Sequence, residues 1–377
     1  MLISIQIARA IAVLAVMSRH LEWVYNDTHA AANSWNSPLL LIGGHGVDLF
    51  FCISGFIIAY LLSERKWTIT DFLLRRFVRI FPLYWLFTLT YLGALWIGCE
   101  TGQRNDCGER VGFSYLLSSL LILPQQTFPA LSVGWSLEHE IIFYAIAGAV
   151  CVAAGRSTEK LLAVLLLLGS IGIVLDVAVP AFFGQAFWSY DLFSPYHFQF
   201  AAGVAVFLFQ RSLLRLNPLV MVALGLLAFW TTHELGTTTP GPGKLPENWQ
   251  SGLATLASVL GYALASAAIL IGLVGAETRG YFKETSKVVG LCIGALVLIG
   301  NASYSLYLMQ PIAYGVMGKA FAWVFSPSLM VPALLLAALA TVIAGTAWHL
   351  LVERPFLHLT HRALIGLRVP EPSIQKL

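Results

Sequence analysis

An arginine and a histidine interrupt the apolar segment IARAIAVLAVMSRHLE near the N-terminus, at positions 9 and 20. In a helix of about 3.6 residues per turn, Arg9 and His20 would share one face, about 16 Å apart along the axis. Burying a guanidinium in the hydrocarbon region costs at least a few kcal/mol unless it faces a cavity or a partner. The pair therefore indicates an intramembrane functional site. The alternative is that Arg9 reaches the headgroups and His20 caps the far end of the helix.

Two carboxylates flank a second histidine in the segment VGWSLEHEIIFYA, where Glu138 and Glu140 follow Trp135. A helix N-terminus explains Glu138 as a capping residue. It does not explain Glu140, because a second carboxylate in a membrane helix is costly unless it lines a wet cavity or binds a partner. We therefore interpret both glutamates as functional.

His45 and Asp48 stand three residues apart in GGHGVDLFFCISGF. This spacing places them on one helical face, where they can orient one another or contact a substrate. The alternative is an aspartate cap at a helix start, with His45 in the membrane interface. Gly55, in the same segment, is interpreted as a site of close helix packing.

Three arginines, Arg75, Arg76 and Arg79, occur in FLLRRFVRIFPLYW. Arg75 and Arg79 have an i, i+4 spacing, at which like charges repel unless an anion lies between them. A phosphate-bearing ligand would supply that anion. Anchoring to lipid headgroups is the alternative.

The C-terminal third has polar residues in GNASYSLYLMQP, which contains Tyr304 and Gln310, and in VERPF. Hydroxyls in a helical bundle commonly form hydrogen bonds between helices. Glu353 is interpreted as a structural pair with the adjacent Arg354.

The composition, with 58% hydrophobic and 11% charged residues among 377, is typical of a polytopic membrane protein. We predict an all-α integral membrane protein with about ten transmembrane helices in one bundle. The domain would span residues 1–355, followed by a basic cytoplasmic tail, 356–377. A spanning helix needs about 20 apolar residues. The predicted spans are 2–24, 44–63, 77–98, 134–154, 160–180, 195–211, 217–235, 252–275, 290–315 and 328–351.

Basic residues concentrate in alternate loops, which predicts that both termini are cytoplasmic. The first helix is expected to be retained, because Arg9 interrupts the apolar run. The run from Phe113 to Leu123 is too short to span and is expected to lie in the interface or re-enter. The charge pattern does not favour a nucleic-acid partner, and the cysteine spacing does not favour a zinc site. Cys99 and Cys107 could form a disulfide if their loop is extracytoplasmic.

Six motifs in register resemble the membrane acyltransferase-3 family, of the exopolysaccharide and O-antigen O-acetyltransferase type. They are the arginine–histidine pair in the first helix, FFCISGF, RRFVRIFPLYW, WSLEHEIIFY, SYSLYL and ERP. The resemblance implies a ten-helix integral membrane enzyme, which we expect in a bacterial inner membrane. This chain has no room between its spans or after Leu377 for the SGNH-type domain that some family members carry fused, so none is expected. It implies that His20 is the key catalytic residue and Arg9 its partner. Family members commonly have histidine where this chain has Gln310, which puts an acid or base role there in doubt.

The resemblance implies transfer of an acetyl group from acetyl-CoA to a hydroxyl of a polysaccharide sugar or of another carbohydrate or lipid-linked acceptor. We expect the arginines of the third span to hold the CoA phosphates, and no metal to take part. His20 would deprotonate the acceptor hydroxyl or be acetylated first. The remaining expected site residues are Glu138 and Glu140, with catalytic roles, and His45, Asp48, Trp135 and Tyr304, which would bind the acceptor.

The competing interpretation is a polytopic transporter or flippase of a carbohydrate or lipid-linked substrate, because intramembrane Arg, His and Glu also form relays. The absence of a detectable internal repeat and the ordered motifs favour the enzyme. The acceptor, acyl chain length and oligomeric state are left open by the sequence.

Overall fold

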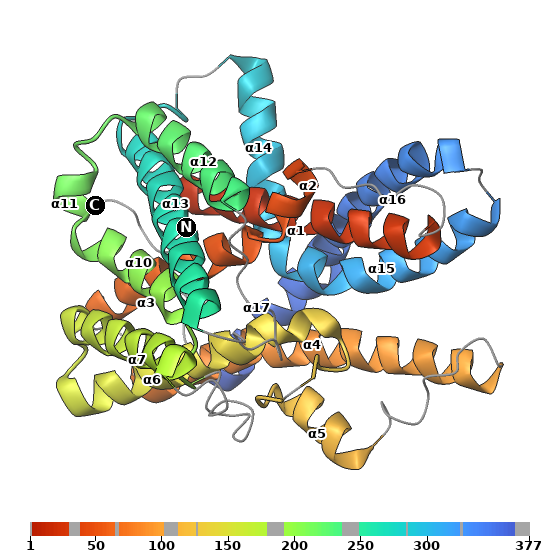
Figure 1. Ribbon diagram of the computed structural model, residues 1–377, viewed down its shortest axis with the longest axis horizontal. Coiled ribbons are helices and arrows are strands. Elements are labelled where there is room, and N and C mark those ends of the chain that lie inside the picture. The colour runs from red at the N-terminus through yellow and green to blue at the C-terminus, as the bar shows by residue number, and fades with distance from the viewer. Residues whose placement is uncertain are drawn as a thin grey trace.

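The fold is described from a computed structural model (Figure 1). The described residues are 2–29, 38–64, 68–101, 112–125, 127–178, 192–235, 249–283, 286–324 and 327–365. Within these ranges all regular secondary structure is helical, which confirms the predicted all-α class.

The helices follow one another in this order: α1 (Ile3–His29), α2 (Pro38–Gly43), α3 (Gly46–Ser63), α4 (Ile69–Glu100), α5 (Phe113–Leu121), η1 (Ser132–Gly134), α6 (Trp135–Ala154), α7 (Thr158–Ala178), α10 (His197–Leu208), α11 (Gln210–Leu213), α12 (Pro218–Glu234), α13 (Trp249–Thr278), α14 (Lys287–Asn301), α15 (Ser303–Val324), α16 (Pro327–Trp348), η2 (His349–Glu353) and α17 (Arg354–Ile365).

Helix α1 runs through the middle of the bundle, with α12 and α13 to one side and α15 and α16 to the other (Figure 1). Its first turns, including Ile5 and Ala12, pack in an apolar core with α3, α10, α12 and α13. Its later turns, including Met17 and Leu21, pack in a second core with α3, α4, α6, α15 and α16. Arg9 therefore lies where the two cores meet.

Seven helices are long and apolar enough to span a membrane, or eight if the bent pair α14–α15 is counted as one span. Two further predicted spans, 195–211 and 217–235, form α10 and α12, which have 12 and 17 residues. The predicted apolar segments are thus helical, and the chain is an integral membrane protein with at least seven candidate spans among its described residues. The predicted short run forms the nine-residue α5, which is tied to α4 by a 2.9 Å hydrogen bond from the Tyr84 hydroxyl to the Ser119 carbonyl.

The predicted span 290–315 is divided by a bend of 72° between α14 and α15. After the bend, α15 runs beside α1 in the same direction. A Cβ added at Gly300 would meet the backbone of Gln6 at 2.0 Å, and one at Gly318 would meet the Val24 side chain at 2.2 Å. Each contact joins residues 294 apart in sequence, as does the hydrogen bond between Arg9 and Ser303. Gly300 ends α14, so α14 meets α1 at Gln6, and the register of α1 and α15 is constant from Arg9 to Val24.

Helix α3 packs closely on α10 through two glycines. A Cβ at Gly55 would lie 2.1 Å from the Phe200 carbonyl oxygen, and one at Gly203 would lie 1.8 Å from the carbonyl oxygen of Cys52. Both distances are shorter than van der Waals contact, so a larger side chain would force the helices apart. The predicted packing role of Gly55 is confirmed.

Candidate active site

A cavity of about 90 Å³ opens between α1, α3, α4, α6 and α15. Its polar lining comes from residues far apart in sequence: Arg9, Ser54, Arg76, Arg79, Ser136, Glu140, Tyr144, Ser303, Tyr304 and Tyr307. One water needs about 10–15 Å³ of such space, so the cavity has room for a group of phosphate size. Three guanidiniums face one carboxylate, which makes the lining net positive.

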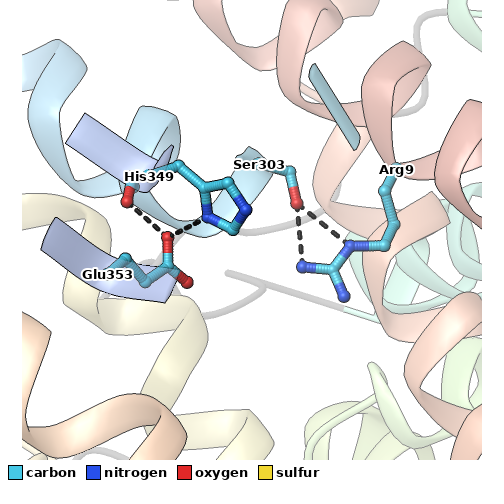
Figure 2. Close-up of polar contacts among 5 residues, drawn as sticks. Arg9, Ser303, His349 and Glu353 are labelled. Carbon is cyan, nitrogen blue, oxygen red and sulfur yellow. Dashed lines mark hydrogen bonds and ion pairs between the residues drawn. The ribbon is translucent and has the colours of Figure 1, made fainter. Parts of the chain in front are cut away.

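Arg9 points from α1 toward the first residue of α15 (Figure 2). Its Nε and Nη2 atoms both donate to the Ser303 hydroxyl, at 3.0 and 2.8 Å. Ser303 is positioned by the break before α15, which places its hydroxyl at the level of Arg9. This hydrogen-bond partner is neutral, and the carboxylates of Glu140 and Glu353 lie in the electrostatic neighbourhood of Arg9 without forming an ion pair with it among the described contacts.

The other two guanidiniums belong to α4, which begins with a capping box between Thr68 and Asp71. Arg76 lies over the rings of Phe72 and Tyr144, at 5.8 and 5.6 Å from their centroids. Its Nε is buried and donates no hydrogen bond. Arg76 also lines the cavity, so its positive charge acts on a ligand bound there.

Arg79, one turn farther along α4, faces Arg9 across the cavity. The two guanidiniums are close enough to repel one another, and Glu353 and Tyr304 also lie in the electrostatic neighbourhood of Arg79. The Arg79 side chain donates no hydrogen bond to the described part of the chain. The sequence paired Arg79 with Arg75, but Arg75 does not line the cavity and lies instead near Asp71.

Glu140 is held by two hydroxyls rather than by a cation. Its Oε1 accepts a hydrogen bond from Ser54 of α3, at 2.7 Å, and a very short one from Tyr144, one turn along α6. Sequence analysis did not identify these partners, although the i, i+4 spacing to Tyr144 was visible. The cavity thus contains a carboxylate with a fixed orientation.

Tyr304 lines the cavity with its ring, while its hydroxyl donates to the Ile80 carbonyl of α4 at 2.7 Å. Beside it, the Tyr307 hydroxyl lies 2.8 Å from Ser136 Oγ and 3.2 Å from the Val133 carbonyl. These bonds fasten α15 to α4 and to the start of α6. Tyr304 is therefore placed at the site, with its hydroxyl already bonded.

Glu353 does not form the predicted structural pair with Arg354. Its carboxylate is buried and contacts His349 Nδ1 at 2.7 Å and the Ser305 hydroxyl at 2.6 Å (Figure 2). Adjacent residues point to different faces of a helix, whereas residues four apart meet, and that spacing to His349 was the signal missed. The segment His349–Glu353 is a π-helix, an irregularity often found at functional sites.

His20 does not line the cavity. Its imidazole lies 5.1 Å from the Trp23 ring, tilted by 50°, and beside the Gln310 side chain of α15. Its Nδ1 atom is buried and has no hydrogen-bond partner. Arg9 and His20 thus occupy two separate positions along the α1–α15 contact.

His45 and Asp48 do orient one another, at 3.0 Å between His45 Nδ1 and Asp48 Oδ2. Asp48 is buried and also accepts a 2.7 Å hydrogen bond from Gln199 of α10. His45 stacks on Tyr262 of α13, with centroids 3.5 Å apart. This cluster lies between α3, α10 and α13 and does not line the cavity.

Trp135 and Glu138 lie at the start of α6, outside the cavity lining. Trp135 packs on His139 and Tyr196, with centroids 5.7 and 5.6 Å apart. Glu138 is buried and accepts a 3.2 Å hydrogen bond from Gln125. The structure therefore separates Glu138 from Glu140, which the sequence had grouped together.

Among the described residues, no group of three or more His, Cys, Asp or Glu side chains is arranged to hold a metal ion. The predicted disulfide involves Cys107, which lies outside the described residues.

Comparison with known proteins supplies the family. The model of a family described as an acyltransferase domain, the acyltransferase-3 family, matches residues 2–349. The chain is 29% identical, over 84% of its length and 90% of the relative's, to the exopolysaccharide production protein ExoZ of Rhizobium meliloti (strain 1021). It is 30% identical, over 46% of its length and 92% of the relative's, to protein 2 in the picA locus of Rhizobium radiobacter. No solved structure matches the chain significantly. The family match over nearly the whole chain, on a helical membrane bundle, shows that the protein is an acyltransferase and belongs to the membrane acyltransferase-3 family.

Proposed function

We propose that this acyltransferase moves an acetyl group from cytoplasmic acetyl-CoA to a hydroxyl of a sugar in an exported or envelope polysaccharide. The polysaccharide acceptor is supported by the similarity to a protein named for exopolysaccharide production. The membrane would be a bacterial inner membrane, with both termini in the cytoplasm. The acyl donor is supported by the charge of the cavity.

The observation that carries the donor assignment is the convergence of Arg9, Arg76 and Arg79 on one cavity. Guanidiniums that lie close together inside a helical bundle repel one another unless an anion lies between them. The planar guanidinium also presents several N–H donors in a geometry that suits phosphate oxygens. Acetyl-CoA carries phosphates at one end and the thioester at the other. If the phosphates bind in this cavity, the pantetheine arm that carries the thioester can extend along α1.

His20 lies farther along α1 from Arg9, eleven residues away, or about 16 Å along the axis. An acyl donor anchored by phosphate at the arginines would extend toward His20. Donor and acceptor would then meet near the opposite side of the membrane from the cytoplasm. This geometry explains how a cytoplasmic donor serves an exported acceptor.

At His20 the reaction exchanges a C–S bond for a C–O bond. In the direct route, the imidazole takes the proton of the acceptor hydroxyl, whose oxygen attacks the thioester carbonyl. The CoA thiolate leaves and takes up that proton. In the two-step route, an imidazole nitrogen of His20 attacks the thioester carbonyl, the C–S bond breaks and the CoA thiolate leaves. The acceptor oxygen then attacks the acetyl carbonyl, the N–C bond breaks to regenerate the imidazole, and the hydroxyl proton passes to the CoA thiolate.

Acetyl transfer itself tests the proposal. Protein in nanodiscs is incubated with acetyl-CoA labelled in the acetyl group and a polysaccharide fraction from exopolysaccharide-producing cells. We expect alkali-labile label in the polysaccharide, competed by unlabelled CoA and less strongly by pantetheine, which lacks the phosphates. Label transfer that pantetheine and CoA inhibit equally would contradict a phosphate site at the arginines. Absence of any transfer would contradict the donor or the acceptor.

A further inference from the structure

The surroundings of His20 follow from the constant register of α1 and α15. Because Arg9 contacts Ser303 and Val24 contacts Gly318, residue n of α1 lies level with residue n + 294 of α15 between Arg9 and Val24, and His20 lies level with Tyr314. Gln310 lies one turn before Tyr314 on α15, and its side chain lies beside the His20 imidazole.

Three polar side chains at this contact have unsatisfied atoms. Gln310 is 0% exposed, and neither atom of its amide has a hydrogen-bond partner of normal geometry among the described residues, although its side chain lies close enough to His20 to interact with it. The His20 Nδ1 atom and the Tyr314 hydroxyl are also buried without partners. An unpaired buried polar group typically costs about 1–3 kcal/mol. Retaining an amide next to an imidazole at this cost points to a role outside the resting structure.

We propose that Gln310 is the positioning residue of His20, an inference that rests on the proposed function of His20. As the acceptor binds, the Gln310 Oε1 atom accepts a hydrogen bond from His20 Nδ1–H. That bond fixes the tautomer in which Nε2 carries the lone pair and faces the substrate. A glutamine does this without a charge, so the imidazole remains neutral and basic near neutral pH.

Two substitutions at position 310 separate the effect of the hydrogen bond from the effect of an added charge. Leucine has similar volume and no polar atoms, so it removes the hydrogen bond and leaves the tautomer unfixed. Glutamate keeps an acceptor oxygen but adds a negative charge, which stabilises the protonated imidazolium. Tyr314→Phe removes a buried unpaired hydroxyl on the same helix one turn away, and serves as the matched control.

The experiment measures free CoA release from acetyl-CoA, with the polysaccharide fraction present, for wild type and for Gln310→Leu, Gln310→Glu and Tyr314→Phe in nanodiscs. We expect Gln310→Leu to lower kcat by about tenfold or more, in the range seen when groups that orient a functional side chain are removed, with KM for acetyl-CoA unchanged. Gln310→Glu should move the acid limb of the kcat/KM profile to higher pH. Tyr314→Phe should keep the wild-type kcat.

Wild-type kcat in Gln310→Leu, or an unshifted acid limb in Gln310→Glu, would overturn the positioning role. The glutamate variant keeps the test decisive if the leucine variant does not fold. A separate variant, His20→Ala, tests the proposed function of His20. If His20→Ala retained full activity, His20 would not be catalytic, whereas a loss there with wild-type behaviour in the Gln310 variants would reject only this inference.

Discussion

At the scale of single residues, the charges of the site are oriented by hydroxyls and not by opposite charges. Arg9 is held by Ser303, and Glu140 by Ser54 and Tyr144. A buried ion pair would satisfy an arginine permanently, and breaking it for a ligand would be costly. The Ser303 hydroxyl instead keeps the Arg9 guanidinium in place without forming an ion pair with it, so Arg9 can still bind an incoming anion.

Arg79 gives a direct test of the anion site, because it lines the cavity and donates no hydrogen bond to the described residues. A charge-assisted hydrogen bond is worth about 1.5–3 kcal/mol. Arg79→Gln should therefore raise KM for acetyl-CoA by about 10- to 100-fold, with a smaller effect on kcat. Steady-state kinetics of CoA release measure both constants. Arg75→Gln is the control, since Arg75 is near but does not line the cavity; equal effects of the two substitutions would argue against a specific phosphate contact.

Residue types and spacing identified Arg9, Arg76, Arg79, Glu140 and Tyr304, which the structure brings to one cavity. Membrane burial makes such residues conspicuous, because each is costly without a purpose. Their grouping was not predictable, since helical periodicity shows which residues share a face but not which helices meet. For this reason the sequence paired Glu353 with the adjacent Arg354. In the structure its partners are His349, four residues before it, and Ser305 of α15.

At the scale of helices, the parallel contact of α1 and α15 organises the site. It sets Ser303 against Arg9 at one level and Gln310 beside His20 at another. The sequence predicted one span over 290–315, because hydropathy is continuous through the bend at Ala302. The structure instead has a bend of 72° there, next to the close approach of Gly300 to the backbone of α1, and a contact between distant segments is not visible in a local hydropathy pattern.

The close contact of α3 and α10 provides a stability prediction. A Cβ at Gly203 would lie 1.8 Å from the Cys52 carbonyl oxygen and 2.7 Å from the Phe56 nitrogen. Overpacking typically costs about 1–3 kcal/mol, so Gly203→Ala should lower the melting temperature in detergent by several degrees. Gly93 of α4 has no atom within 4 Å of an added Cβ, and Gly93→Ala should be neutral or stabilising. A thermal shift assay compares the two; a Gly203 variant as stable as the Gly93 variant would contradict the packing.

At the scale of the whole molecule, hydrogen bonds between α1 and α13 show which helix ends lie on the same side of the bundle. Glu277, at the end of α13, accepts hydrogen bonds from the first backbone amides of α1, Ile3 and Ser4, at 3.0 and 2.8 Å. The start of α1 and the end of α13 therefore lie on the same side, as the alternation of basic loops predicted. If the N-terminus lies in the cytoplasm, as we propose, Arg9 lies nearer the cytoplasmic side of α1 than His20 does.

This orientation predicts the accessibility of two exposed positions. In a variant without exposed native cysteines, Lys283→Cys after α13 should react with a membrane-impermeant maleimide only after cells are permeabilised. Thr127→Cys, in the segment before α6, should react in intact cells. Gel shifts of the labelled protein report both reactions. The opposite pattern would place the arginines on the acceptor side and contradict transfer from a cytoplasmic donor.

The central claim is that His20 performs acyl transfer from acetyl-CoA. The most direct measurement is free CoA release by nanodisc-held protein, wild type beside His20→Ala, with and without the polysaccharide fraction. We predict release by the wild type that rises with polysaccharide and falls by at least about 100-fold in His20→Ala, the lower range for loss of general acid–base catalysis. Binding of acetyl-CoA should persist in the variant, because the arginines are intact. Equal CoA release by the two proteins would contradict the catalytic role of His20.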